Sequence, residues 1–315
     1  MPLPELKEGT MTYTEIVKKL EKPKGKIDAV LDTDTFNEID DQYALSYMLR
    51  SDEKIATKAI YAAPFSNLKA ETPKEGMEKS YEEILRVLDL NGMNDLTPCV
   101  FRGSAEYLPD EKTPVRSDAA EDLVSRAMKY PEDAPLYVIA IGAITNIASA
   151  ILMKPEIIDH IVVVWLGGNS IHWPDNKEFN LYQDIAAARI IFGCGVPLIQ
   201  LPCMGVVSAF TTSGPELEYH LRGKNRLCDY LVDVTTEEAL KMNTGNKETW
   251  SRPIWDATAI GWLLDGDYMD DCIISSPIPE FDHHYGFDLT RHPIKCVYHV
   301  HRDNLFADLF AKLAK

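Results

Sequence analysis

The sequence predicts a single-domain α/β fold with a mostly parallel, doubly wound (Rossmann-like) sheet. Short apolar runs rich in Val and Ile alternate along the chain with segments of helical spacing, which is the pattern of a parallel sheet covered by helices. The segment 158–166 contains a near-continuous Val/Ile run, as a strand buried on both faces does. The 315 residues, of which 45% are hydrophobic, are enough for one large domain with a sizeable core.

Each element of this pattern has a local signal. A β-branched run predicts the first strand at 27–31, and apolar residues at helical spacing predict a helix over 40–49. Before them, 13–20 reads as a short amphipathic helix that ends at a Lys-Pro-Lys-Gly breaker. The region 215–262 is mainly helical in pattern. The other predicted elements are strands at 56–62, 136–141, 158–166, 196–201 and 295–300 and helices at 76–90, 146–153, 184–192 and 303–313.

The charge balance restricts the partners of the protein. There are 32 Lys and Arg against 49 Asp and Glu, a net charge of −17, which disfavours a nucleic-acid partner and suits metal cations or neutral small molecules. No apolar stretch reaches the roughly 18 residues of a membrane span, so we expect no membrane partner. The charged N-terminal stretch lacks a signal-type core, and the six scattered cysteines are typical of free thiols. We therefore expect a cytoplasmic protein.

Five carboxylates follow the first predicted strand within ten positions: Asp32, Asp34, Glu38, Asp40 and Asp41. Acids at a helix start are favoured by the helix dipole, which accounts for Asp40 or Asp41 as simple caps. It does not account for so many acids at one strand end, because like charges repel unless one is protonated or a cation lies among them. Oxygen ligands from one loop suit Ca²⁺ or Mg²⁺. We predict a divalent metal site here, and the composition alone leaves the metal open.

Two enzyme families have an Asp-x-Asp motif at a strand end. In the haloacid-dehalogenase-like phosphatases, Asp32 would be the nucleophile and Asp34 the acid/base, with Mg²⁺ as the metal. The later segment Gly266-Asp-Tyr-Met-Asp-Asp271 resembles the GDxxxD metal motif of that family, although so short a motif is weak in an acidic chain. This phosphatase is the alternative from another reaction class.

The calcium-dependent nucleoside hydrolases, an inosine/uridine-preferring family, resemble the chain more strongly. Their opening motif is a strand, DxD, a short turn, and DD at a helix start; here Asp32-Thr-Asp34 precedes Asp40-Asp41 after a turn two residues longer than the commonest form. The resemblance implies the nucleoside hydrolase-like fold, with 26–315 as the catalytic domain and 1–25 as an N-terminal extension. Further matching segments follow in the same order: Ile141-Gly-Ala-Ile-Thr-Asn146, Val163-Val-Trp-Leu-Gly-Gly168, Glu178-Phe-Asn180, Asp184 and Trp255-Asp-Ala-Thr258.

The resemblance implies hydrolysis of the N-glycosidic bond of ribonucleosides to free base and ribose, with a Ca²⁺-bound water as nucleophile. The implied Ca²⁺ ligands are Asp34, Asp41, Asp256 and the main-chain carbonyl of Ile141. Asp34 is also the implied general base, because a ligand of the same metal lies within hydrogen-bond reach of the water. Family members usually form dimers or tetramers, so a homo-oligomer is implied as well.

The resemblance also implies which residues contact the sugar. Asn67 lies near the family's second-strand asparagine, with Ser66 as the alternative match. The family's asparagine before the Glu-Phe-Asn motif corresponds to Asn169 or Asn176. The implied ribose contacts are Asp40, Asn67, Asn169, Glu178 and Asn180.

The residue before the late aspartate bears on the base. Many nucleoside hydrolases have a histidine there to protonate the leaving base, whereas this chain has Trp255. That tryptophan resembles the purine-preferring branch, which stacks the base between aromatic rings. We therefore expect Trp255 to stack on the base and the enzyme to lean towards purines. Trp173 and Tyr107 are candidates for a second aromatic, and His172 for an acid.

Several of these residues also have purely structural interpretations. Asn180, Asp184 and Asp256 could each cap the helix that follows. For Thr145-Asn146 a helix cap alone is the preferred interpretation. A third function, besides hydrolase and phosphatase, is a catalytically silent protein that binds a ribosyl ligand without cleaving it.

Overall fold

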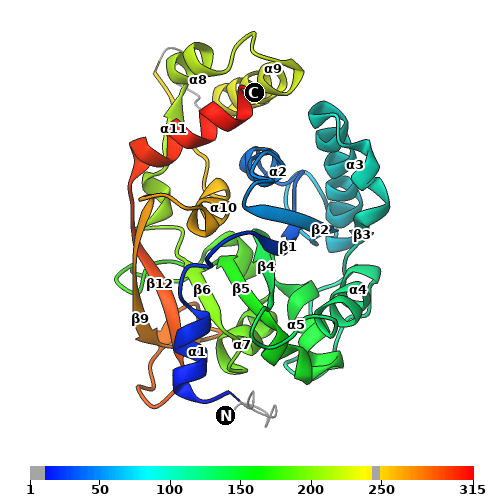
Figure 1. The fold of residues 1–315 in the computed structure, drawn as a ribbon, viewed down its shortest axis with the longest axis vertical. Coiled ribbons are helices and arrows are strands. Elements are labelled where there is room, and N and C mark those ends of the chain that lie inside the picture. Colours follow the sequence, from blue (N-terminus) through cyan, green and yellow to red (C-terminus); the bar gives the residue numbers. More distant parts are fainter. Residues whose placement is uncertain (1–10, 243–248) are drawn as a thin grey trace.

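An eight-stranded sheet organises the protein (Figure 1). The computed structural model describes residues 11–242 and 249–315, and its strand order is β3-β2-β1-β4-β5-β6-β12-β9. Neighbouring strands are parallel except for β12 and β9 at one edge. The mostly parallel, doubly wound sheet is therefore confirmed. The strands are β1 (Ile27–Thr33), β2 (Ile55–Ala62), β3 (Val100–Arg102), β4 (Leu136–Ala140), β5 (Ile161–Leu166), β6 (Leu198–Leu201), β9 (Met269–Ser275) and β12 (Pro293–Val300).

Helices cover both faces of the sheet and create two apolar cores. Successive residues of a strand point to opposite faces, so Ala29 and Leu31 of β1 join one core and Val30 joins the other. The first core is completed by α2 (Asp40–Leu49), α3 (Pro73–Asn91), α9 (Arg226–Met242), α10 (Ala257–Leu263) and α11 (Arg302–Leu313). The second is completed by α4 (Asp118–Ala127), α5 (Thr145–Met153) and α7 (Ile185–Gly193).

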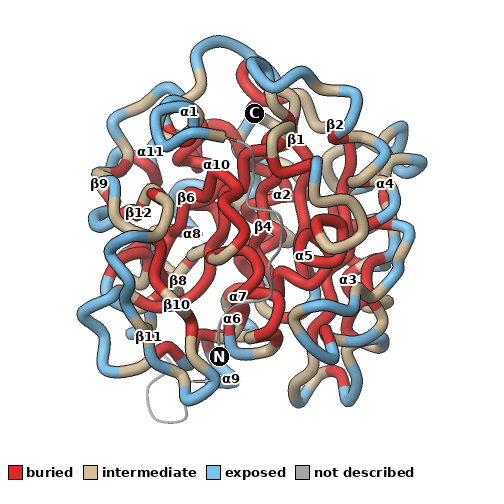
Figure 2. The backbone as a smooth tube through the Cα atoms, turned by 90° about the horizontal axis from the view of Figure 1, so that it is seen from below, coloured by how far each residue is buried: buried red, intermediate tan, exposed pale blue. Residues whose placement is uncertain are grey.

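Helix α2 is the most deeply placed of the elements that carry the predicted acids. All ten of its residues are buried, and Figure 2 shows it with β1 and β4 among the buried central segments. The turn 34–39 connects the end of β1 to the start of α2. This connection brings a strand end and a helix start together at the carboxyl edge of the sheet, where ligands of such folds bind.

The structure departs from the predicted elements where the local signal is short. Strand β3 has three residues, too few for periodicity to register, and β9 pairs antiparallel at the sheet edge. The predicted strand at 158–166 begins only at Ile161, because residues Pro155–His160 form a 3₁₀ helix. The region predicted as mainly helical contains α9 and α10 but also β8 (Ser251–Pro253), which pairs with β7 (Thr211–Ser213).

The predicted N-terminal helix is present as α1 (Tyr13–Lys19), where Thr12 and Glu15 form a capping box. Ile16 and Leu20 are 5% and 0% exposed and belong to the first core, so this part of the extension packs on the main body. Within 11–242 and 249–315 no helix is long and apolar enough to cross a membrane. The six cysteines, all in these ranges, are free thiols, as predicted.

Candidate active site

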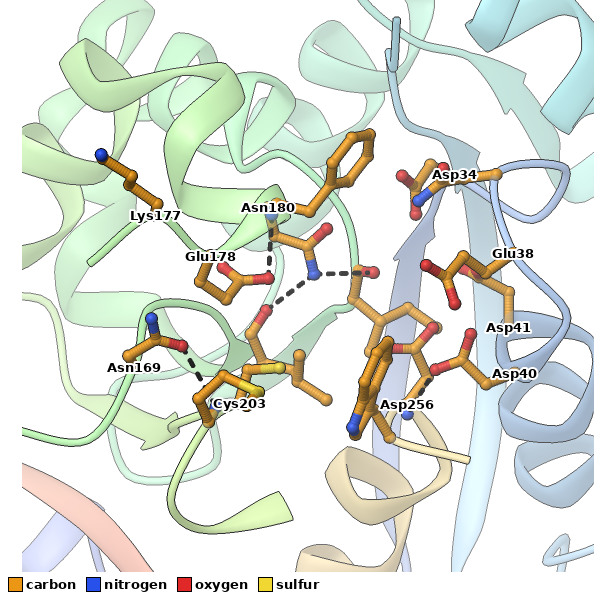
Figure 3. A pocket seen from close by; sticks show the side chains of 16 residues that line it. Asp34, Glu38, Asp40, Asp41, Asn169, Lys177, Glu178, Asn180, Cys203 and Asp256 are labelled. Carbon is orange, nitrogen blue, oxygen red and sulfur yellow. Dashed lines mark hydrogen bonds between the residues drawn. The ribbon is translucent and has the colours of Figure 1, made fainter. Parts of the chain in front are cut away.

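A pocket of about 200 Å³ opens at the carboxyl edge of the sheet (Figure 3). Its walls come from the ends of β1, β4 and β5, the first turns of α2 and α6 (Phe179–Gln183), the segment after β6, and the residues before α10. The lining residues are Asp34, Asn37, Glu38, Asp40, Asp41, Ile141, Leu166, Asn169, Lys177, Glu178, Phe179, Asn180, Cys203, Met204, Trp255 and Asp256.

Three carboxylates of this pocket form a compact group. Asp40, Asp41 and Asp256 each offer an oxygen, and these ligand atoms lie within 4.8 Å of one another. The chain brings them together from the start of α2 and the start of α10, more than two hundred residues apart, and the main-chain N–H of Asp256 donates to Asp40 Oδ2 at 3.2 Å. The Asp256 side chain makes no capping hydrogen bond to α10. The simple cap interpretation of Asp256 therefore does not describe its side chain.

The electrostatics of the group favour a cation. Burial, followed by the neighbouring carboxylates, raises the pKa values of Asp40 and Asp256 well above the ordinary range. Burial also raises the pKa of Asp41 to about 7, against the opposing effect of the Thr33 hydroxyl, which donates to it at 2.5 Å. Acids in this state repel one another when ionised, and a divalent ion among them removes that repulsion.

Asp34 lies beside the three-carboxylate group and not within it. It lines the pocket, is 1% exposed, and its Oδ2 has no hydrogen-bond partner among the described residues. A Cβ atom at Gly142 would lie 3.1 Å from Asp34 Oδ1, so glycine there allows the close approach of the loop after β4. All four residues predicted as metal ligands line this one pocket. The three carboxylates that lie closest together, however, include Asp40, whereas the predicted ligand set includes Asp34.

The opposite wall is built by the Glu-Phe-Asn segment. The Glu178 carboxylate accepts from the main-chain N–H groups of Gly168, Asn180 and Leu181 at 2.8, 2.9 and 2.9 Å, so it caps α6 while lining the pocket. Burial raises its pKa to about 7. Asn180 Nδ2 donates to the main-chain carbonyl of Ile141 at 3.2 Å, which ties this wall to the predicted carbonyl ligand (Figure 3).

Asn169 and Asn176 take different places. Asn169 lines the pocket, and its side chain bridges the loop because Oδ1 accepts from Met204 N–H at 3.1 Å and Nδ2 donates to the Asp175 carbonyl at 3.1 Å. Asn176 is buried outside the lining, where its Oδ1 accepts from the Asn169 N–H at 2.7 Å. Of the two alternatives, Asn169 is therefore the one that faces the pocket.

Asn67 lies outside the pocket lining. Its Nδ2 donates to Asn37 Oδ1 at 2.8 Å, and Asn37 is the residue that faces the pocket. The alternative, Ser66, is also outside the lining, with its hydroxyl 3.2 Å from that of Tyr107. The physical reason is that Asn37, in the turn after Asp34, lies between Asn67 and the pocket.

Thr145 and Asn146 are the first two residues of α5, and its N-cap position is Ile144. Asn146 Nδ2 donates to Asp32 Oδ1 at 2.7 Å and its Oδ1 accepts from the Ser104 N–H at 2.7 Å, while the Thr145 hydroxyl donates to Asp184 Oδ2 at 2.7 Å. The interpretation of these two residues as a cap alone is wrong, because their partners come from other strands and helices that sequence periodicity does not identify.

Of the residues of the phosphatase alternative, Asp34 lines this pocket, whereas Asp32 and the acids of the GDxxxD segment do not belong to its lining. Asp32 is fully buried beneath the lining, held by Asn146, and its burial raises the pKa to about 7. The GDxxxD segment runs into the edge strand β9, where Asp271 accepts from Trp262 Nε1 at 2.9 Å and pairs with Lys295 at 3.1 Å. That acid is thus engaged elsewhere in the fold.

Trp255 is the aromatic residue that the prediction placed in the site, and it lines the pocket. Phe179 is a second lining aromatic that the sequence did not single out, whereas Trp173 and Tyr107 are outside the lining. Among the described residues that line the pocket there is no histidine, and His172 is exposed on the neighbouring loop. Other residues missed by the sequence are Asn37, Lys177, Cys203 and Met204.

The fold and this pocket define a class: a doubly wound α/β protein with a carboxylate-rich ligand site at the carboxyl edge of its sheet. Residues 29–301 match the family described as inosine-uridine preferring nucleoside hydrolase. Because the match covers most of the chain, the protein belongs to that family. The resemblance found in the sequence is confirmed.

Individual relatives are more distant. The pyrimidine-specific ribonucleoside hydrolase RihB of Escherichia coli O1:K1 / APEC is 30% identical over 153 residues, which cover 45% of this chain and 48% of that protein. The chain thus spans about half the length of the curated relatives it matches.

Solved structures show the same fold at low identity. The purine-preferring ribonucleoside hydrolase from Gardnerella vaginalis has a TM-score of 0.74 and 21% identity, covering 91% of this chain and 98% of that chain. The plant nucleoside hydrolase PpNRh1 has a TM-score of 0.73 and 20% identity, covering 93% and 99%. The type III effector protein XopQ, complexed with adenosine diphosphate ribose, has a TM-score of 0.65 and 16% identity, covering 97% and 98%.

Proposed function

We propose that the protein hydrolyses the N-glycosidic bond of ribonucleosides, releasing the free base and ribose. One observation carries this proposal: the carboxylates of Asp40, Asp41 and Asp256 meet in one pocket beside Asp34, opposite Glu178. The family membership supports the reaction class. A purely structural acidic cluster would not need so many buried carboxylates around one open space.

The residues present fit Ca²⁺. The compact group supplies three hard oxygen ligands, the Ile141 carbonyl lies in the same pocket, and Asp34 keeps a buried oxygen that has no hydrogen-bond partner among the described residues. Asp34, Asp41, Asp256 and the Ile141 carbonyl would hold the ion, with Asp40 adjoining. Bound Ca²⁺ would polarise the attacking water and orient the ribose hydroxyls.

Asp34 is the proposed general base. The water must lose a proton as it attacks the anomeric carbon, because the sugar becomes oxocarbenium-like and water is a poor nucleophile. Asp34 lines the pocket, and its buried Oδ2 atom accepts no hydrogen bond from a described residue, so this oxygen is available to take that proton.

Sugar binding is assigned to the two walls of the pocket. Asp40 accepts from a ribose hydroxyl, and Glu178, Asn180 and Asn169 bind the hydroxyls on the opposite side. Main-chain N–H groups fix the Glu178 carboxylate, so it is held ready for the sugar without rearrangement. Asn67 does not contact the sugar in this proposal but positions Asn37, to which it donates a hydrogen bond.

The base is proposed to stack on Trp255, with purines preferred. Trp255 lines the pocket, Phe179 also lines it, and stacking on an aromatic ring is worth on the order of 1–3 kcal/mol per base. A larger purine ring gains more from such contact than a pyrimidine. Because the described part of the chain places no histidine in the pocket lining, proton delivery to the leaving base falls to solvent in this proposal. A homo-oligomer and a cytoplasmic location complete it.

A reducing-sugar assay tests the function directly. Inosine, adenosine, guanosine, uridine and cytidine are incubated with the protein in the presence of Ca²⁺ or a chelator. Release of ribose that the chelator abolishes supports the proposal, and faster release from the purines supports the role of Trp255. Equal rates on all five nucleosides remove the stacking argument, and no release from any of them contradicts the hydrolase.

A silent ribosyl-ligand binder is the second candidate. The solved structure of XopQ, which shares the fold, is complexed with adenosine diphosphate ribose. Calorimetric binding of a nucleoside or of adenosine diphosphate ribose together with Ca²⁺, but without ribose release, would favour this candidate over the hydrolase.

A further inference from the structure

The longer turn between Asp34 and Asp40 places two side chains, Asn37 and Glu38, on the pocket wall. Glu38 lies at a different depth from the aspartates. Its side chain is 30% exposed, whereas Asp34 and Asp40 are 1% and 3% exposed. Because its side chain is more exposed than the aspartates, Glu38 lies nearer the mouth of the pocket, and we call the buried end where the carboxylate group meets its floor.

The turn is clamped from two sides. Arg252 of β8, which is itself buried, donates from Nη2 to Glu38 Oε2 at 3.0 Å. From the second-strand loop, Lys69 Nζ donates to the Asn37 carbonyl and Asn67 Nδ2 donates to the Asn37 side chain, both at 2.8 Å. Contacts to main chain and side chain on both sides fix the orientation of Glu38 before any ligand arrives.

The clamp uses only part of the Glu38 carboxylate. Oε2 is paired with Arg252, and within the described residues Oε1 accepts no hydrogen bond. An ionised carboxylate can only accept hydrogen bonds. Glu38 thus offers the pocket a fixed acceptor for a ligand N–H or O–H group.

The position of Glu38 indicates which part of a nucleoside it meets. The buried floor carboxylates and Glu178 would hold the sugar, so the base would extend towards the mouth, to the side of the partly exposed lining residues Glu38 and Trp255. Arg252 precedes Trp255 by only three residues, so one segment both clamps Glu38 and supplies the proposed stacking ring. Stacking holds the face of the base, and a carboxylate beside the ring can contact its edge.

Resting on the proposed function, we propose that Glu38 is a specificity-determining residue that accepts a hydrogen bond from an N–H group on the edge of the nucleobase. The favoured substrates are bases with such a donor, namely a ring imide N–H or an exocyclic amine. Bases that present only acceptors leave Oε1 unpaired and place their lone pairs against a negative charge.

The test compares inosine, which has a ring N–H, with purine riboside, which has the same sugar and ring system but no N–H on the base. The readout is the ratio of kcat/KM for the two nucleosides, so that general damage to the enzyme cancels. Glu38→Gln is expected to lower this ratio about tenfold, the difference between a hydrogen bond to a charged and to a neutral group, and Glu38→Met, which removes the oxygen acceptor, should lower it at least as much. Glu237→Gln, an acid-to-amide change on the exposed side of α9, is the control and leaves the ratio unchanged.

Two results would overturn the proposal. The first is an unchanged ratio in both Glu38 variants; an equal loss for both nucleosides is such a result, and it places Glu38 at the sugar or in a purely structural role. The second is that Arg252→Met, which keeps the carboxylate and removes the clamp, lowers the ratio as much as Glu38→Met does; the effect then belongs to the ion pair. If the wild-type protein cleaves neither nucleoside, the proposed function fails separately, and calorimetric affinities for the same pair in wild type and Glu38→Gln still decide the role of Glu38.

Discussion

Removing Asp256 should remove the effect of calcium on stability. A ligand present at 100 times its dissociation constant stabilises the folded state by about 2.7 kcal/mol. At about 2.1 cal/mol/K per residue, the unfolding entropy of 315 residues is about 0.66 kcal/mol/K, so calcium should raise the Tm of the wild type by about 4 °C. Asp256→Asn removes one of the three closely grouped carboxylates, so the calcium-dependent rise in Tm should vanish. Differential scanning fluorimetry in excess CaCl₂ or chelator measures it.

The direction in which Asp256→Asn changes the Tm in the absence of calcium distinguishes a metal ligand from a structural residue. Burial, followed by the charges of the adjacent Asp40 and Asp41, raises the pKa of Asp256, and its side chain makes no capping bond. An asparagine of the same shape therefore relieves repulsion, and the chelated variant should melt at or above the Tm of the chelated wild type. Asp303→Asn, at a carboxylate that is 90% exposed, is the control and keeps the full calcium response. A rise of about 4 °C retained in Asp256→Asn, or absent from the wild type, would refute the reasoning.

Three further predictions follow from other parts of the molecule. Asn146→Ala leaves Asp32 and the Ser104 N–H without their buried partner and should lower the free energy of unfolding by about 2–4 kcal/mol in urea titrations; a loss below 0.5 kcal/mol would contradict the network. The described pocket lining contains six carboxylates and one cationic side chain, that of Lys177, so it should repel a phosphate group. The inhibition constant of inosine 5′-monophosphate should therefore be at least about tenfold higher than the dissociation constant of inosine. Equal constants would count against this charge argument. Burial lowers the pKa of His292 from its ordinary 6.5 to about 4, so the unfolded chain binds the proton more readily and the free energy of unfolding falls as pH falls from 6.5 towards 4. His292→Gln should reduce this fall in the free energy of unfolding between pH 7 and pH 5 by about 1–2 kcal/mol. If the free energies of unfolding of wild type and variant run parallel with pH, His292 contributes nothing.

Local patterns predicted the parts of the site that one segment encodes. The apolar spacing over 40–49 predicted α2 with its observed ends, and the DxD and DD motifs placed Asp34, Asp40 and Asp41 at a strand end and a helix start. Because the carboxyl ends of parallel strands share one edge of a sheet, the Glu-Phe-Asn segment and Asp256 were also expected there, and all of them line one pocket.

Features that depend on distant partners were beyond the reach of the sequence. Glu38 is oriented by Arg252, which is 214 positions away, and nothing in either local sequence signals the pair. Asn146 resembles a helix cap in sequence, yet its partners are Asp32 on β1 and Ser104 in the loop after β3. Side-chain hydrogen bonds of this kind are set by tertiary packing, which periodicity and motif spacing do not describe.

The burial of the acids is a physical argument for a cation at this site. Asp40 and Asp41 occupy the first turn of a fully buried helix, where the positive end of the helix dipole stabilises each charge by typically 0.3–1 kcal/mol. Taking an ion out of water costs several kcal/mol even after relaxation, so the dipole alone cannot keep these acids ionised beside Asp256. The group must either share protons, as the raised pKa values indicate, or share a divalent ion. A metal-free protein should therefore take up protons at this group, and calcium binding should release them, which calorimetry in buffers of different ionisation enthalpy would detect as a buffer-dependent heat.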